Sequence, residues 1–189
     1  IGPVFTKLEN GIITGVQTLI TLPYGIGSFI MGGLYAVTVV AGIHHMYTLI
    51  DLGQLARYGY TYWLPLASAA NVAQGGAALA VALKSKDTKV KSMALPSALS
   101  ACMGITEPAI FGVNLRYFKP FIGGLLGGAC GAWYASIVGL GATGTGVTGI
   151  FGILLHLHMP LQYIIMMAIS FGVSFAVTWA IWSPEEVKA

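Results

Sequence analysis

The feature that most constrains this chain is a series of apolar runs, several of them about as long as a lipid bilayer is thick. Six such stretches lie at 10–22, 26–43, 61–83, 92–113, 121–140 and 161–182, and a weaker glycine-rich run occupies 141–159. A helix needs about 20 apolar residues to cross the hydrocarbon core. Only 8% of the 189 residues are charged, against about 25% in soluble domains. The sequence therefore predicts an all-α integral membrane protein with several transmembrane helices.

The remaining composition favours neither nucleic-acid binding nor redox chemistry. The basic residues that give the net charge of +3 lie in short loops rather than along one face. Cys102 and Cys130 are isolated in apolar surroundings, which is typical of small buried residues rather than of a disulfide, metal or redox site. Residues 1–9 lack the basic start of a cleavable signal peptide, and the chain does not open with Met. We expect it to be a piece of a longer protein.

Charged residues predict that the stretch 92–115 turns back inside the membrane. Lysines 84, 86, 89 and 91 precede it, and Arg116 and Lys119 follow it. A single crossing would place these two basic clusters on opposite sides, against the positive-inside tendency. The segment GITEP (104–108) lies near the middle, where Gly104 and Pro108 would break a helix. We predict a re-entrant hairpin that enters from the cytoplasm, with GITEP at its tip.

The same assignment of chain segments to the two sides of the membrane predicts a second hairpin at 26–57. The span 61–83 ends inside and so begins outside, and the break at GIHHMY (42–47) places His44 and His45 near the tip of a hairpin entered from outside. The predicted cytoplasmic cations are Lys7, Lys84, Lys86, Lys89, Lys91, Arg116, Lys119 and Lys188, with Arg57 outside. A span and outer hairpin followed by a span and inner hairpin form an inverted repeat, an arrangement by which many transporters build a midplane site.

Glu107 is the first candidate for chemistry, because it stands inside an apolar stretch. An ionisable residue at a helix centre costs about 2.5–3.5 kcal/mol on insertion scales, so it normally faces a cavity or a partner. One interpretation is a carboxylate that caps a broken helix or pairs with Arg116. The other is a hydrogen-bond acceptor for the hydroxyls of a polar solute. Thr106, beside it in GITEP, is a further candidate ligand.

The histidines form two pairs of different character. His44 and His45 point about 100° apart on a helix, a limit that relaxes at a hairpin tip. One of them is a candidate ligand and general base, and the alternative is a structural role. His156 and His158 precede Pro160 at a predicted membrane boundary, where an interfacial, structural role is favoured. No HExxH motif or cysteine pair accompanies the histidines, so no metal site is predicted.

Two polar or small-residue patterns remain inside the apolar runs. Asn71 and Gln74 share one helix face, and they either reach a ligand or hydrogen-bond a neighbouring helix. The glycines of GGLLGGACG at 123, 127 and 131 recur every fourth residue. That spacing indicates close helix packing and no catalytic role.

The segments GIHH, LPLASAANVAQGGAALAV and LPSALSACMGITEPAIFGVNLRYFKPF closely resemble the membrane (IIC) component of the bacterial phosphoenolpyruvate-dependent sugar phosphotransferase system. Within it they look most like the sucrose/trehalose/β-glucoside branch of the glucose–sucrose superfamily. The resemblance implies an N-terminal half that forms a homodimer and a C-terminal half whose two re-entrant hairpins hold the sugar. Residues 1–189 resemble the C-terminal half alone. By resemblance, Glu107 and one of His44 and His45 contact the sugar.

The resemblance also implies partners and a reaction. Phosphate would arrive from a cysteine on a cytoplasmic IIB domain, and nothing in this chain resembles that domain's phosphocysteine loop, so neither cysteine receives that role. The chain would supply sugar binding and translocation across the bacterial inner membrane, without a cofactor. Phosphorylation, by the family's habit on the 6-hydroxyl of a glucosyl unit, adds negative charge that Glu107 would repel. NVAQGGA and FGVNLR look closest to the sucrose branch, followed by trehalose and β-glucosides.

Two functions of other classes stay open at this point. One is a secondary transporter that uses Glu107 as its proton site. The other is an intramembrane hydrolase with histidine and glutamate as the catalytic pair, although no nucleophile motif such as GxSxG is present. Uptake that persists without phosphoenolpyruvate and collapses with a protonophore would favour the proton-coupled function.

Overall fold

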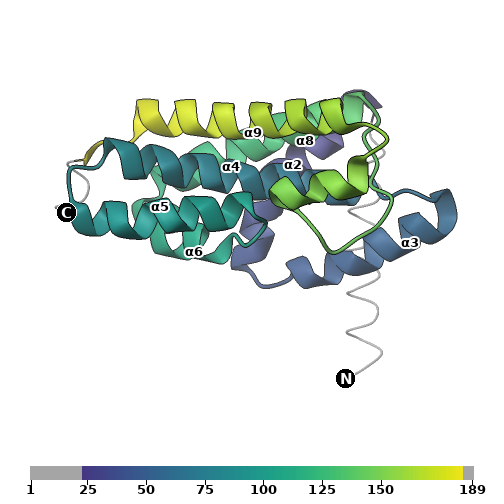
Figure 1. Ribbon diagram of the computed structural model, residues 1–189, viewed down its shortest axis with the longest axis horizontal. Helices are drawn as coiled ribbons and strands as arrows, with labels where there is room; N and C mark the ends of the chain where they lie inside the picture. Colours follow the sequence, from purple (N-terminus) through teal and green to yellow (C-terminus); the bar gives the residue numbers. More distant parts are fainter. Residues whose placement is uncertain (1–22, 185–189) are drawn as a thin grey trace, which may run out of the picture.

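The computed structural model describes residues 23–184, and most of these are helical (Figure 1). Their one β-type contact is an isolated antiparallel bridge between Thr61 and Ala142. The all-α prediction is therefore confirmed for this part of the chain. The predicted span 10–22, Lys7 and Lys188 lie outside the described residues.

The helical elements end where the sequence offers a proline, a glycine or a charged loop. They are η1 (Pro23–Gly25), α2 (Ile26–Val40), η2 (His44–Tyr47), α3 (Thr48–Tyr58), α4 (Trp63–Lys84), α5 (Thr88–Cys102), α6 (Glu107–Ala109), η3 (Ile110–Asn114), α7 (Leu115–Tyr117), α8 (Lys119–Ile137), η4 (Gly149–His156) and α9 (Pro160–Ile181). Prolines stand in the first turns of α8 and α9, where a missing N–H costs nothing. The apolar run 92–113 is broken after Cys102, and Gly104 makes the turn with a φ of 100°.

Helix α4 forms the centre of the bundle and packs against α2, α5, α8 and α9. Figure 1 shows it between α9 and α5. Nearly all of its residues are buried, as expected for a helix surrounded by protein. Helices α4 and α9 are the two described helices that are long and apolar enough to cross a membrane. At 1.5 Å per residue, 22 residues span about 33 Å, close to the thickness of a hydrocarbon core.

Helix α8 packs through two rows of glycine. Side-chain carbons at Gly123, Gly127 and Gly131 would overlap the polar row of α9, which consists of Ser170, Ser174 and Thr178. A carbon at Gly124 would overlap Gln74 of α4, and a carbon at Gly128 would overlap the carbonyl oxygen of Gly32 on α2. The predicted packing role of this glycine pattern is confirmed, because the helix backbones approach too closely for a larger residue.

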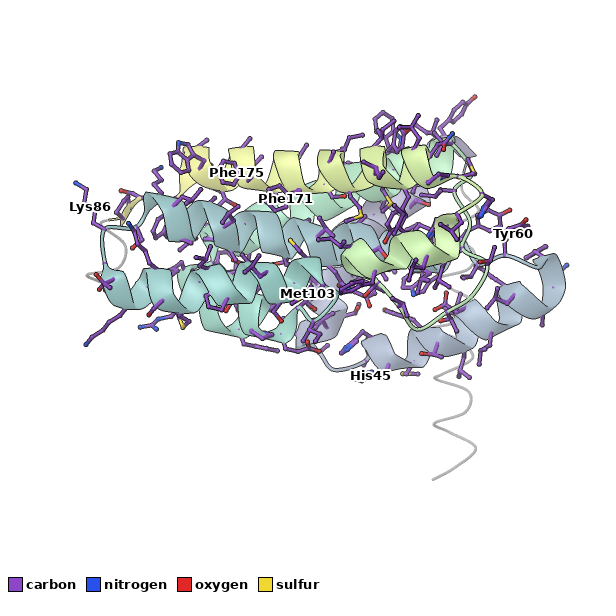
Figure 2. The ribbon with its side chains drawn as sticks, viewed as in Figure 1. His45, Tyr60, Lys86, Met103, Phe171 and Phe175 are labelled. Carbon is purple, nitrogen blue, oxygen red and sulfur yellow. The ribbon has the colours of Figure 1, made fainter. Side chains whose placement is uncertain are left out.

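The helix ends gather at two opposite ends of the bundle. At one end, the Lys84 ammonium donates to the carbonyl of Trp182, and the Tyr117 and Trp182 rings are 5.7 Å apart. The ends of α4, α7 and α9 therefore lie together. At the other end the Tyr60 and His158 rings are 5.2 Å apart. Figure 2 shows Lys86 and Tyr60 at these two ends.

The chain reverses direction twice between these ends. Helix α2 begins at the Tyr60 end, where the Trp133 indole donates to the carbonyl of Tyr24 over 3.0 Å, and α3 returns there after the turn 41–47. Helix α5 begins at the Lys86 end, and α6, η3 and α7 return there after the turn 103–106 (Figure 1). The two turns therefore come from opposite ends of the bundle.

Candidate functional site

A cavity of about 340 Å³ lies where the two turns meet. This volume is at the lower end of the range of small-molecule sites. Its walls come from the first reversal, the start of α4, the second turn and the glycine-rich loop before η4. The lining residues include Tyr35, His44, His45, Tyr47, Asp51, Trp63, Asn71, Gly104, Thr106, Glu107, Thr145, Gly146 and Thr148. The cavity is therefore built from four segments that are far apart in the sequence.

Glu107 and His44 approach each other across this cavity. The distance between His44 Nε2 and Glu107 Oε1 is 4.0 Å, and the Glu107 side chain is 49% exposed. Glu107 follows the turn at Gly104, while His44 begins η2 in the other turn. The structure thus pairs Glu107 with His44. Arg116 lies instead at the end of α7, with its guanidinium 5.8 Å from the centre of the Tyr117 ring.

The two adjacent histidines occupy different positions. The His44 side chain is 16% exposed, and its Nδ1 atom is buried without a hydrogen-bond partner among the described residues. His45 is exposed, and its ring centre is 4.0 Å from that of His44. Figure 2 shows His45 at the edge of the molecule, just before α3. Of the two, His44 is therefore the one that faces the carboxylate.

Asn71 and Gln74, which share one face of α4, have different surroundings. Asn71 lines the cavity, and its amide nitrogen donates to the Thr148 hydroxyl over 3.0 Å and to the Gly104 carbonyl over 3.4 Å. Gln74 is buried outside the cavity lining, where its side-chain oxygen accepts from the Asn114 amide over 2.8 Å. Asn71 thus joins the site, whereas Gln74 connects α4 to the π-helical turn η3. Thr106 is buried and lines the cavity beside Glu107.

Sequence reasoning missed an aromatic wall and a second carboxylate in the cavity. The Tyr47 and Trp63 rings meet edge to face at 4.5 Å, and the Tyr35 and Trp63 rings are 6.0 Å apart. Aromatic walls with a few polar groups are typical of small-molecule sites. Asp51, on α3, is 4% exposed and also lines the cavity. Like Glu107, Asp51 is a lone carboxylate among apolar residues, and this is the signal in the sequence that identifies it.

The remaining histidines and the cysteines do not contribute to this cavity. His156 is fully buried, stacks on Tyr163 at 4.3 Å and has its Nδ1 atom 2.7 Å from the carbonyl of Gly152, which supports its structural role. His158 is exposed beside Tyr60. Cys102 and Cys130 are free thiols on α5 and α8. Among residues 23–184, no three His, Cys, Asp or Glu side chains form a group able to hold a metal ion.

Comparisons with known proteins relate the chain to sugar phosphotransferase systems. A family model described as "Phosphotransferase system, EIIC" matches residues 1–128. The sucrose-specific EIIBC component of Salmonella typhimurium is 46% identical over 94% of this chain and 40% of the relative. The trehalose-specific EIIBC component of Bacillus subtilis (strain 168) is 38% identical over 95% of this chain and 39% of the relative. The beta-glucoside-specific EIIBCA component of the same strain is 36% identical over 73% of this chain and 23% of the relative.

These relatives are all longer than the chain described here. It spans about 40% of the length of the sucrose-specific EIIBC components of Salmonella typhimurium and Klebsiella pneumoniae. No solved structure matches the sequence.

Proposed function

Because this chain belongs to the EIIC family of the phosphotransferase system, we propose that it is the sugar-binding, C-terminal half of a sugar permease. The observation that carries the proposal is the meeting of His44 and Glu107, from two separate turns, at one cavity. The other half of the membrane domain forms a homodimer. A IIB domain, present by name in the EIIBC relatives, delivers the phosphate. The protein lies in the bacterial inner membrane and crosses it several times.

The proposed topology makes both chain reversals re-entrant hairpins. The α2–α3 hairpin enters from outside and the α5–α7 hairpin from the cytoplasm, which places the cavity near the membrane midplane. Lys84 and Tyr117 both lie beside Trp182, which supports placing the ends of α4, α7 and α9 together on the cytoplasmic side. Irregular backbone at the two turns is tolerated in a membrane because it lines a cavity. The two units then form an inverted repeat around the sugar.

The proposed binding mode assigns different tasks to the cavity walls. Glu107 accepts hydrogen bonds from sugar hydroxyls, and charge-assisted bonds of this kind are the stronger class. Thr106 and Asn71 supply further polar contacts, and Trp63 and Tyr47 pack on the apolar faces of the sugar rings. The sugar is a glucoside; sucrose is the first choice because sucrose-specific components are 46% and 45% identical to this chain. Gln74, the other amide that the sequence suggests as a ligand, lies outside the cavity lining and acts through its hydrogen bond with Asn114.

The proposed reaction transfers a phosphoryl group from IIB to the bound sugar. The S–P bond of the phosphocysteine breaks, an O–P bond forms at the sugar hydroxyl, and the hydroxyl proton passes to a histidine. His44 has the position for this general base, because its Nε2 atom lies 4.0 Å from Glu107, a group that also contacts the sugar in this proposal. The phosphorylated sugar carries nearly two negative charges. Repulsion by Glu107 then favours release and makes uptake one-way.

The proposed function is tested by the energy source of uptake. Cells that express the full-length protein are expected to accumulate labelled sucrose only as its phosphate, and only when phosphoenolpyruvate and the phosphate-carrying proteins are present. A protonophore is expected to leave the rate of sugar phosphorylation in membrane vesicles unchanged. Accumulation of unmodified sucrose that the protonophore abolishes would contradict the proposal and support proton coupling through Glu107.

His44 and His45 are expected to differ sharply when each is replaced by alanine. His44→Ala removes the group that faces Glu107 and should slow sugar phosphorylation by at least tenfold, since general bases contribute about 10²–10⁴-fold. His45→Ala, at an exposed position, should slow it less than threefold. The measurement is the initial rate of phosphorylation in membranes that contain equal amounts of each variant. Equal, mild losses in both variants would assign the histidine pair a structural role.

A further inference from the structure

Asp51 is a buried carboxylate that the proposed function leaves unused. It is 4% exposed on α3, within the cavity lining. A buried charge is costly unless it is paired or hydrogen-bonded. The two oxygens of Asp51 accept from threonine hydroxyls rather than from a cation: Oδ1 from Thr61 over 2.5 Å and Oδ2 from Thr145 over 2.9 Å. Asp51 therefore joins three segments of the chain.

Thr145 belongs to the glycine-rich loop 143–148, which forms one wall of the cavity. The loop is anchored at its start, where Ala142 bridges to Thr61 and the Thr143 amide donates to the Leu155 carbonyl over 3.0 Å. It is anchored at its end, where Thr148 accepts from Asn71. Between these anchors, residues 144–147 are held in the described structure by one hydrogen bond, from Thr145 to Asp51. Gly146 has a φ of 97°, and because glycine adopts positive and negative φ about equally, the backbone of this part can change its conformation readily.

The Asp51 side chain therefore determines the position of this wall of the cavity. Three residues of the loop, Thr145, Gly146 and Thr148, line the cavity. Loss of a hydrogen bond to a charged group shifts a local equilibrium by about ten- to a hundredfold. Within residues 23–184, the middle of the loop has no other hydrogen bond to replace it, so we expect the wall to open.

We propose that Asp51 is a positioning residue of the sugar site, which fixes the loop 143–148 against α3 and thereby closes the cavity around the ligand. The proposal rests on the proposed function for the identity of the ligand. Asp51 acts here through Thr145, whose hydroxyl donates to its Oδ2 atom.

A matched pair of variants at Thr145 tests this role in the full-length protein. Thr145→Val keeps the shape but removes the hydroxyl, whereas Thr145→Ser keeps the hydroxyl. We expect Thr145→Val to weaken the binding of radiolabelled sucrose by about tenfold or more and Thr145→Ser to bind within about threefold of the parent. Equal affinity of the valine variant and the parent would overturn the proposal.

A second readout needs no sugar and so separates this proposal from the proposed function. In full-length protein whose native cysteines are replaced by alanine, a cysteine introduced at the exposed Val147 reports the opening of the loop through its rate of reaction with a thiol reagent. Thr145→Val should raise this rate about tenfold, and Thr145→Ser should not. If the parent protein binds no sucrose, trehalose or β-glucoside, the proposed function fails while the labelling rates still test Asp51. An unchanged rate in Thr145→Val would overturn the role of Asp51.

Asp51→Asn distinguishes positioning from direct contact of the charge with the sugar. The amide keeps one acceptor oxygen and gains a donor for the second threonine hydroxyl. Its hydrogen bonds are neutral rather than charge-assisted, so we expect the labelling rate at position 147 to rise and the affinity for sucrose to fall together, each by less than in Thr145→Val. Loss of sucrose binding with an unchanged labelling rate would contradict the positioning role, because the charge itself would then be the ligand's partner.

Discussion

Replacing Glu107 by Gln is expected to weaken sugar binding by about one to two powers of ten. Gln keeps the size of the side chain and one acceptor oxygen, but its hydrogen bonds to sugar hydroxyls are neutral rather than charge-assisted. A hydrogen bond to a charged group contributes about 1.5–3 kcal/mol and a neutral one about 0.5–1.5 kcal/mol, so the loss over two such bonds is about 2–3 kcal/mol. The change also removes the carboxylate that lies 4.0 Å from the His44 Nε2 atom. The measurement is calorimetric titration of the purified full-length protein with sucrose.

Two further variants make the Glu107 result specific. Glu107→Asp keeps the charge but shortens the side chain, so it should also bind poorly if the carboxylate must reach a hydroxyl. A purely electrostatic or helix-capping role predicts nearly normal binding by Asp. Asp87→Asn is the matched control for loss of charge, since Asp87 caps α5 by accepting from the Lys89 amide over 2.7 Å and Asn caps equally well. Parent-like affinity in Glu107→Gln would show that the carboxylate is not the acceptor for the sugar.

The sequence was sufficient to predict the parts of the fold that depend on local chemistry. Apolar length predicted α4 and α9, and Gly104 with Pro108 predicted the break between α5 and α6. The four-residue glycine spacing predicted close helix packing, and the structure shows α8 packed against α9 at these glycines. Each of these features depends on residues a few positions apart, so a single stretch of sequence contains the whole signal.

The candidate site was predictable only where a residue was unusual in its own surroundings. Glu107 stood out as a charge in an apolar run, and His44 as part of a polar break, and the structure brings them to one cavity. The sequence could not separate His44 from His45, because the direction of each ring depends on how η2 turns into α3. Nor could it separate Asn71 from Gln74, whose partners Thr148 and Asn114 come from other segments.

The glycine-rich run 141–159 was the least predictable part. It forms a loop and the 3₁₀-helix η4 rather than a span. Thr145 contacts Asp51, which lies 94 positions earlier in the chain. No local propensity reports a contact over that distance, since it exists only after α3, α4 and α8 have packed. The wall of the cavity is therefore a property of the tertiary structure.

Three positions at the two ends of the bundle are each expected to be accessible from one side of the membrane only. In the proposed topology, two hairpins enter the membrane from opposite sides and meet at the sugar. Lys86 and Lys119 are exposed at positions that flank the α5–α7 hairpin, and Tyr60 is exposed at the opposite end of the bundle (Figure 2). Basic clusters flank the α5–α7 hairpin, and by the positive-inside tendency they place both ends of this hairpin in the cytoplasm.

The most direct test is to label single cysteines at these positions with a membrane-impermeant thiol reagent. Lys86→Cys, Lys119→Cys and Tyr60→Cys are made separately in full-length protein whose native cysteines are replaced by alanine, and intact cells are compared with inside-out vesicles. We expect Lys86→Cys and Lys119→Cys to react only in the vesicles and Tyr60→Cys only in the cells. Reaction of Lys86→Cys and Lys119→Cys from opposite sides would mean that the stretch 92–115 crosses the membrane, and it would contradict a sugar site formed by two re-entrant turns.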